Sequence, residues 1–387
     1  MLKPKLAGMI ASFLIAYGLL VWYIGWNGWV YLNTLFELEN RGVYAAVIVL
    51  IAISYLIGRA GQSVSGFGIG LAARVFKLIG SYWFAVLEYA LLLLPVANIA
   101  ALILKTLGVT SRQYVIVVGT IVILMLGALL IRGSWNAWTP AVQTYRVTVN
   151  KDAGGRKKLR IAVASDIHLG TIVGNRHLKR LLKELDRMKP DLILLPGDVI
   201  DDDIEPYIRN NMSEYMRKLK APLGVYAVLG NHEYIGGHIP RYVEEMKAIG
   251  IRVLMDESVL VDDSFYIIGR KDLSAGRTPE GRLSTAELAA GLDESRPLIL
   301  MDHQPSDLDE YAEAGIDISL SGHTHRGQFA PNHWITRRLF ELDHGYLHKG
   351  SLHAIVSSGF GTWGPPVRIA SRSEIVQVEV TFEPPAP

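Results

Sequence analysis

Four long apolar stretches near the start of the chain limit its fold more than any other feature. They cover approximately residues 6–26, 42–60, 81–104 and 113–132. Each approaches or exceeds the ~20 residues that an α-helix needs to cross the hydrocarbon core of a bilayer. We therefore predict about four transmembrane spans in an N-terminal helical domain over residues 1–135.

The distribution of charge separates this region from the rest of the chain. Up to Pro140 there are nine Lys or Arg, three Glu, no Asp and no His, whereas the 387 residues together hold 39 Lys or Arg, 37 Asp or Glu and 11 His. Such a division predicts a membrane segment followed by a water-soluble domain. We expect a connecting segment over 136–157 and a soluble domain over 158–387.

Net charge and cysteine content exclude several classes of function. The formal net charge of +2 gives no bulk electrostatic reason to expect nucleic-acid binding. The absence of cysteine excludes a disulfide scaffold, an iron–sulfur site and thiol catalysis.

Basic residues near the spans predict which side of the membrane the soluble domain occupies. One set of flanking segments carries Lys3, Lys5, Arg59, Arg74, Lys77, Arg132, Arg146, Lys151, Arg156, Lys157, Lys158 and Arg160, and the opposite loops carry Arg41, Lys105 and Arg112. Because cytoplasmic loops are enriched in Lys and Arg, we expect both termini and the soluble domain to be cytoplasmic. The alternative of a cleaved secretory signal is disfavoured, since the first apolar run is longer than a usual signal core.

Polar residues follow five short apolar runs of the soluble domain. The runs 159–164, 192–195, 224–229, 297–301 and 316–320 are typical of buried strands. They are followed by Asp166-x-His168, Gly197-Asp198, Gly230-Asn231-His232-Glu233, Asp302-His303 and Gly322-His323-Thr324-His325. A single pair of this kind is commonly a turn or a helix cap. Five in order predict one shared site, because ligands gather at the carboxyl ends of strands.

The side chains of these blocks are suited to divalent metal ions. They offer imidazoles, carboxylates and one amide oxygen, without thiolates, which favours Mn, Fe, Zn, Co or Ni. Two such ions about 3.5–4 Å apart can clamp a phosphoryl group and polarise a water molecule. One carboxylate must then bridge the ions, and Asp198 is the natural choice.

In this order the five blocks resemble the calcineurin-like metallophosphoesterase superfamily over residues 158–380. The segments 165–170 and 361–366 also resemble a membrane-anchored bacterial subgroup. The resemblance implies an α/β four-layer domain of two packed mixed sheets flanked by helices. It implies metal 1 at Asp166, His168, Asp198 and His325, and metal 2 at Asp198, Asn231, His303 and His323. It further implies a metal-bridging hydroxide that attacks phosphorus in line, with His232 stabilising or protonating the leaving oxygen and Asn231 touching the phosphate.

Several further polar residues have less specific predictions. The subgroup more often has glycine in place of Arg326, whose guanidinium could contact a second phosphate or a sugar carboxylate, or pair with a surface carboxylate. His177 is expected on a solvated helix face, and Asp201-Asp202-Asp203 in a helix-entry cap and acidic loop. His238, His333, His344, His348 and His353 are interpreted as packing or surface residues, the last four in a loop-rich region.

We therefore predict a membrane-anchored phosphoesterase that hydrolyses a phosphodiester or pyrophosphate, in a lipid-linked headgroup. The short stretch 133–149 motivates the lipid substrate, with 133–138 and Tyr145 expected as an aromatic collar at the interface. A soluble nucleotide or phosphomonoester substrate, with the spans acting only as an anchor, is the alternative. A third option is a non-catalytic metal-binding scaffold, which the complete set of expected ligands disfavours.

Overall fold

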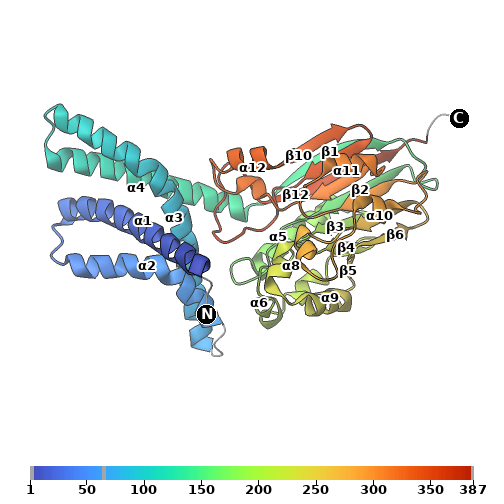
Figure 1. Ribbon diagram of the computed structural model, residues 1–387, viewed down its shortest axis with the longest axis horizontal. Helices are drawn as coiled ribbons and strands as arrows, with labels where there is room; N and C mark the ends of the chain where they lie inside the picture. The colour runs from blue at the N-terminus through green and yellow to red at the C-terminus, as the bar shows by residue number, and fades with distance from the viewer. Residues whose placement is uncertain (1–3, 63–66, 385–387) are drawn as a thin grey trace. The chain divides into compact units, whose positions relative to one another are not determined.

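The computed structural model describes residues 4–62 and 67–384, and the chain divides into two compact units, Met1–Gly133 and Ser134–Pro387. Figure 1 labels the elements of both units. The N-terminal unit consists of helices, and the C-terminal unit contains both strands and helices.

Four long helices make up the N-terminal unit, α1 (Pro4–Phe36), α2 (Arg41–Gln62), α3 (Phe67–Thr106) and α4 (Ser111–Trp138). All four are long and apolar enough to cross a membrane, which agrees with the predicted spans. At 1.5 Å per residue, α3 is roughly 60 Å long, about twice the hydrocarbon thickness. Its first turns include residues 68–80, which run into the third apolar run without an intervening proline.

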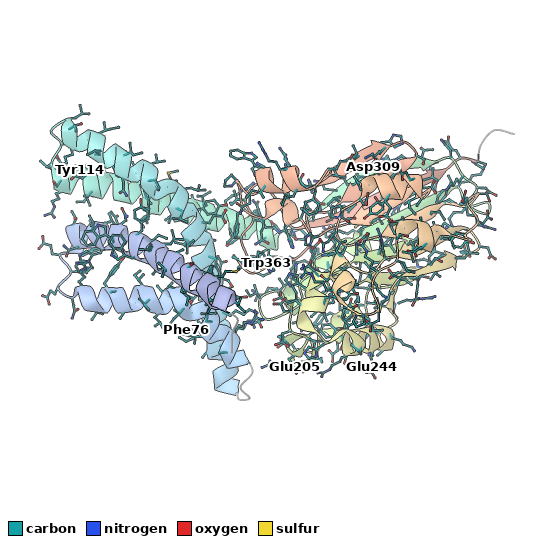
Figure 2. The ribbon with its side chains drawn as sticks, viewed as in Figure 1. Phe76, Tyr114, Glu205, Glu244, Asp309 and Trp363 are labelled. Carbon is teal, nitrogen blue, oxygen red and sulfur yellow. The ribbon has the colours of Figure 1, made fainter. Side chains whose placement is uncertain are left out.

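The helices of this unit carry apolar side chains on their outer surfaces (Figure 2). On α4, Leu124 is 66% exposed and Ile131 is 75% exposed. Between helices, the Tyr17 hydroxyl donates to the Ala52 carbonyl at 2.7 Å, and the Trp83 indole donates to the Tyr17 oxygen at 3.0 Å. An apolar exterior with hydrogen bonds between helices is the pattern expected of helices in lipid.

The described residues of the C-terminal unit form twelve strands. They are β1 (Ala141–Val149), β2 (Lys158–Val163), β3 (Leu192–Pro196), β4 (Val225–Val228), β5 (Arg252–Val253), β6 (Glu257–Val261), β7 (Phe265–Gly269), β8 (Leu298–Met301), β9 (Ile318–Ser321), β10 (Gly345–Lys349), β11 (Leu352–Val356) and β12 (Glu374–Phe382). Its helices beyond the end of α4 are α5 (Asn175–Met188), α6 (Glu205–Arg209), α7 (Ser213–Met216), α8 (Asn231–Gly236), α9 (Ile239–Ala248), α10 (Thr285–Ala289), α11 (Leu308–Glu313) and α12 (His333–Leu339), with the 3₁₀ turns η1 (Leu273–Arg277) and η2 (His325–Gly327).

These strands form two six-stranded mixed sheets, ordered β1-β12-β2-β3-β4-β5 and β10-β11-β9-β8-β7-β6. Successive side chains of β3 point to opposite faces, as strand geometry requires. Leu192 and Leu194 join the core between the sheets, whereas Ile193 and Leu195 pack in the core that includes α5. A third core joins the second sheet to α10 and α11. The predicted four-layer architecture is therefore confirmed.

The connecting segment expected over 136–157 contains strand β1, which pairs in parallel with β12. The partner strand lies more than 200 residues away, so the local sequence pattern could not reveal the pairing. Tyr145 of β1 stacks on Tyr346 with ring centroids 6.0 Å apart, which places it in the sheet domain. The region expected to be loop-rich around 333–353 forms α12 and the β10–β11 hairpin.

Candidate metal centre

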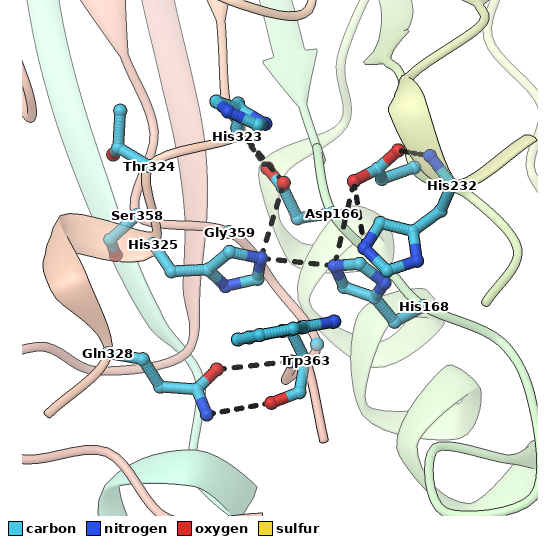
Figure 3. Close-up of polar contacts among 12 residues, drawn as sticks. Asp166, His168, His232, His323, Thr324, His325, Gln328, Ser358, Gly359 and Trp363 are labelled. Atoms are coloured by element: carbon cyan, nitrogen blue, oxygen red, sulfur yellow. Dashed lines mark hydrogen bonds and ion pairs between the residues drawn. The ribbon is translucent and has the colours of Figure 1, made fainter. Parts of the chain in front are cut away.

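The predicted site residues lie directly after five strands. β2, β3 and β4 are parallel neighbours in one sheet, and β8 and β9 are parallel neighbours in the other. Their carboxyl ends carry Asp166 and His168, then Asp198, then Asn231 and His232, then His303, and then His323 and His325. The structure brings all these side chains together (Figure 3 shows part of the group).

Asp166, His168 and His325 form the first cluster, in which one ligand atom from each residue lies within 4.8 Å of the others. The two Nε2 atoms of the histidines are 3.0 Å apart, and His325 Nε2 is 3.4 Å from Asp166 Oδ1. Burial lowers the pKa of His168 to about 3 and holds that of His325 well below its ordinary value. Neutral imidazoles beside a carboxylate, with nitrogen lone pairs converging, fit a divalent cation.

Asp198, His303 and His323 form the second cluster. Asp198 Oδ2 is 3.1 Å from His303 Nε2, and Asn231 Oδ1 is 2.8 Å from His323 Nδ1 and 3.1 Å from His303 Nε2. The Pro196 carbonyl lies 2.8 Å from His303 Nδ1 and so takes that N–H, which turns Nε2 toward Asp198. Burial would lower the pKa of His303, but the Asp198 charge holds it well above its usual value.

Asp198 lies beside both clusters, because the same Oδ2 atom is 3.9 Å from His168 Nε2. Burial would raise its pKa, but the adjacent His303 holds the pKa of Asp198 below its usual range. A divalent cation bound by Asp198 would supply the positive charge that, without the cation, the proton on His303 supplies. The donor set therefore fits cations on either side of a shared carboxylate.

His232 lies at the edge of the clusters, with Nε2 4.0 Å from Asp198 Oδ2. Its Nδ1 is 2.7 Å from Asp202 Oδ1. Burial would lower the pKa of His232, but the hydrogen bond to Asp202 and the surrounding carboxylates raise it to about 9. The surrounding carboxylates therefore favour the protonated form of His232, which can donate a proton.

The acidic run 201–203 divides between two roles. Asp203 accepts a hydrogen bond from the backbone N–H of Glu205 at 2.9 Å, which agrees with the predicted helix-entry cap. Asp201 and Asp202 instead face His232, and the three offer ligand atoms within 4.8 Å of one another. The sequence interpretation missed this contact because it joins loops about 30 residues apart.

The backbone at the clusters is strained. Positive φ angles between 47° and 69° occur at Asp166, His168, Asp198, His323 and His325. A non-glycine residue pays about 1 kcal/mol or more for this left-handed conformation, which persists only where the surroundings enforce it. The backbone N–H of His323 donates to both oxygens of Asp166, at 3.0 and 3.1 Å. A Cβ on Gly322 would collide with the same carboxylate, so glycine is required there.

Glu233 joins two of the site loops, although its role was not predicted. Its carboxylate accepts backbone hydrogen bonds from Asp198 at 3.1 Å, Ile200 at 2.9 Å and Gly230 at 2.7 Å. Burial and the Asp198 charge raise the pKa of Glu233 to about 8, although these three N–H groups favour the ionised form. Glu233 therefore holds the loop after β3 against the loop after β4.

Arg368 is a second residue that sequence reasoning missed. It is fully buried, and its Nη2 lies 3.0 Å from His325 Nδ1. The guanidinium also donates to the carbonyls of Ser358 at 2.7 Å and Gly359 at 3.1 Å. Nothing in the local sequence marks this arginine, because its partner lies 43 residues earlier.

Arg326 follows directly after His325, also with a positive φ of 51°. Among the described residues its guanidinium has no hydrogen-bond or ion-pair partner, so the predicted alternative of a surface carboxylate is not found.

Trp363 is 58% exposed, with its ring centroid 6.5 Å from that of His232 (Figure 3). Gln328 holds its backbone by hydrogen bonds of 2.9 and 3.0 Å.

The prediction that His177 lies on a solvated face was wrong. The side chain is buried, stacks on Phe360 with centroids 4.1 Å apart, and has Nε2 3.0 Å from the Phe360 carbonyl. Residues 177, 181 and 185 are spaced by four along α5, which places His177 on the same buried face as Leu181.

Comparison with known proteins agrees with the chemistry of this site, which is that of a metal-dependent phosphoesterase. The calcineurin-like phosphoesterase family profile matches residues 159–327, a range that contains every predicted metal ligand. The chain belongs to the calcineurin-like metallophosphoesterases, as its motifs predicted.

Three relatives illustrate how far the similarity extends. An uncharacterized metallophosphoesterase of Aquifex aeolicus is 34% identical over 244 residues, 62% of this chain and 91% of that protein. One of Campylobacter jejuni is 29% identical over 321 residues, 79% of this chain and 84% of its own length, so the alignment reaches into the helical unit. A Danio rerio protein named a transmembrane protein with metallophosphoesterase domain is 31% identical over 256 residues, 62% of this chain but only 57% of that protein.

Proposed function

We propose that this protein hydrolyses a phosphodiester or pyrophosphate bond in a lipid-linked headgroup, with two divalent ions held at the five strand ends. The observation that carries the proposal is the pair of clusters that meet at Asp198, with His232 at their edge. Metal 1 would be held by Asp166, His168, Asp198 and His325, and metal 2 by Asp198, Asn231, His303 and His323. When bound, such ions neutralise phosphate charge and activate a water molecule for attack on phosphorus.

The protein side chains would supply the proton and the positioning. Asp202 fixes the imidazole of His232 through Nδ1, so that Nε2–H is free to protonate the leaving oxygen. Asn231 would contact the phosphate, and the guanidinium of Arg326, which has no partner among the described residues, would hold a second phosphate or a sugar carboxylate. If Arg326→Ala leaves both KM and kcat unchanged on the true substrate, this role of Arg326 is wrong.

The last turn of α4 supports a substrate at the membrane surface. The Asn136 side chain donates to the Arg368 carbonyl at 3.0 Å, and the Arg368 guanidinium reaches His325. Asn136 lies only four residues, or about 6 Å of helix, beyond Arg132 at the end of the fourth apolar run. Arg368 therefore connects the metal centre to the last turn of α4, the helix that contains the fourth predicted span.

The catalytic part of the proposal is tested with Asp198→Ala in detergent-purified, metal-reconstituted protein. We expect hydrolysis to fall to background and the bound metal, measured by inductively coupled plasma mass spectrometry, to decrease. His348→Ala, which alters a histidine of the β10–β11 hairpin, is the matched control. Retained hydrolysis in Asp198→Ala would show that the site is assigned wrongly, and absence of hydrolysis in the wild type would favour a binding scaffold.

The substrate class is tested with paired panels. Each lipid-linked phosphodiester or pyrophosphate is compared with its water-soluble headgroup, alongside nucleotides and phosphomonoesters. We expect kcat/KM to be higher for the lipid-linked member of a pair. Turnover of only the soluble compounds would contradict the lipid-headgroup substrate and favour the spans as a simple anchor.

We also propose that the C-terminal unit is cytoplasmic, as the basic flanking residues indicate. Lys158 is exposed at the start of β2, and the chain contains no cysteine, so a single Lys158→Cys substitution gives a unique label site. A membrane-impermeant maleimide should label it only after cells are opened. Labelling in intact cells would place the unit on the opposite side.

A further inference from the structure

The most exposed apolar side chains of the described C-terminal unit gather in a few places. Those more than half exposed are Trp135, Ile235, Trp334, Ile335, Leu339 and Trp363. Three of them, Trp334 at 66%, Ile335 at 58% and Leu339 at 72%, belong to the seven-residue helix α12. Three exposed apolar groups on so short a helix mark a surface that is covered by something apolar.

The three side chains occupy one side of α12. At about 100° per residue, Trp334, Ile335 and Leu339 fall within an arc of about 140°. Arg337 and Arg338 are exposed on the same helix, beside or within this arc. A helix that lies in a membrane interface typically carries apolar side chains, Trp among them, on one face. Its arginines extend their charged ends past these apolar groups toward water.

The position of α12 favours the bilayer over a protein partner. Its start packs on Gly327, where an added Cβ would collide with the backbone of Asn332 and His333. Gly327 is two residues from His325, the histidine that Arg368 connects to Asn136 in the last turn of α4. The last turn of α4 and the start of α12 are therefore both connected to the turn that carries His325.

We propose that α12 lies in the headgroup layer of the membrane that the N-terminal helices cross. Trp334, Ile335 and Leu339 enter the outer acyl region, and Arg337 and Arg338 bind the phosphates of anionic lipids. The membrane helices keep α12 at a high local concentration near the bilayer, so a small apolar area is sufficient for docking. This inference deepens the proposed function, on which its meaning for catalysis rests, since it sets the metal centre at headgroup depth.

Spin labelling of the full chain tests the docking without any substrate. Single cysteines replace Trp334, Ile335 or Leu339 in the cysteine-free protein, with Leu260→Cys and Leu273→Cys as exposed controls at 38% and 45%. The labelled proteins are reconstituted in nanodiscs of phosphatidylcholine with phosphatidylglycerol. We expect the α12 labels to be more accessible to oxygen than to a nickel chelate, and the control labels to show the reverse.

Two other outcomes would overturn the proposal. Equal accessibility of α12 and control labels would mean that α12 faces water. Protection of the α12 labels from both reagents would mean that protein, and not lipid, covers the helix. Because no substrate is present, either result is independent of which phosphate ester the enzyme cleaves.

A charge variant tests the lipid preference. Arg337→Gln/Arg338→Gln should reduce the depth of the Leu339→Cys label in anionic nanodiscs and leave it unchanged in pure phosphatidylcholine. Arg209→Gln/Arg277→Gln, which removes two exposed arginines elsewhere in the unit, is the matched control. Unchanged depth in the α12 variant would contradict the assigned role of these arginines.

Discussion

The two units of the chain place apolar and polar groups in opposite ways. In the helical unit, large apolar side chains such as Leu124 and Ile131 are more than half exposed, whereas Ile161 and Leu192 of the C-terminal unit are completely buried. The C-terminal unit in turn buries the ionisable groups of Asp166, Asp198 and Arg368.

This difference determines what holds each unit together. Between helices in lipid, burial of apolar surface gives little driving force, so close packing of small residues matters. On Gly58, for example, an added Cβ would lie 2.7 Å from the Ala73 carbonyl oxygen and would also meet the backbone of Lys77. In the C-terminal unit each buried charge must be partnered, which couples stability to the chemistry of the site. Substitutions in the two units should therefore have different effects on stability and on catalysis.

The largest effect is expected from His232→Ala. Loss of the proton donor should lower kcat by about 10²–10⁴-fold, because general acid catalysis typically contributes that much. Bound metal should remain, since His232 is not among the proposed ligands. The measurement is hydrolysis with metal analysis of the same sample, with the exposed His238→Ala as control. Full activity in His232→Ala would remove it from the mechanism.

The next largest effect is expected from the pH dependence of folding at His177. Burial lowers its pKa to about 4 in the folded state, against an ordinary 6.5. Between these values the unfolded chain binds more protons, so His177 lowers the free energy of unfolding as pH falls from 6.5 to 4, by at most about 3 kcal/mol. Denaturation of wild type should be more acid-sensitive than that of His177→Gln, whereas His238→Gln should match wild type. Equal acid sensitivity of wild type and His177→Gln would contradict this account.

A smaller and more diagnostic effect is expected from Asp202→Asn. The Asp202 carboxylate accepts a hydrogen bond from Nδ1 of His232 and so raises the pKa of His232. The proposed mechanism requires protonated His232, so activity is lost as pH rises through that pKa. The substitution should move the alkaline limb of the kcat profile down by about 1–3 pH units. Asp203→Asn, which alters only the helix cap, should leave the profile in place. If the alkaline limb of the kcat profile does not move in Asp202→Asn, then Asp202 does not set the pKa of the proton donor.

The smallest effect on catalysis is expected from the helical unit. Gly58→Val should destabilise the packing of α2 on α3 by about 1–3 kcal/mol through overpacking. Hydrolysis of a soluble substrate per folded molecule should stay at the wild-type level. Gly127→Val, where an added Cβ meets nothing within 4 Å, serves as the control for both measurements. If Gly58→Val also lost hydrolysis per folded molecule, packing in the helical unit and catalysis in the C-terminal unit would be coupled.

Local patterns account for what could be predicted from the sequence. The apolar runs before Asp166, Asp198 and His323 each end in a polar block, so both the strands and their site residues could be located. The spacing of four residues between His177 and Leu181 also indicates that His177 shares the buried face of α5. By contrast, the contact of Arg368 with His325 joins distant segments and leaves no local trace.

The pairing of β1 with β12 has a consequence for synthesis. β12 lies between β1 and β2 in the sheet, so the first strands made by the ribosome can be joined only after the last strand is complete. By that time the four apolar helices have already left the ribosome. The first sheet of the C-terminal unit must therefore stay incomplete until translation passes Phe382, whereas every strand of the second sheet precedes β12. Nascent chains stalled before Glu374 should be protease-sensitive beyond α4, whereas released chains should be resistant.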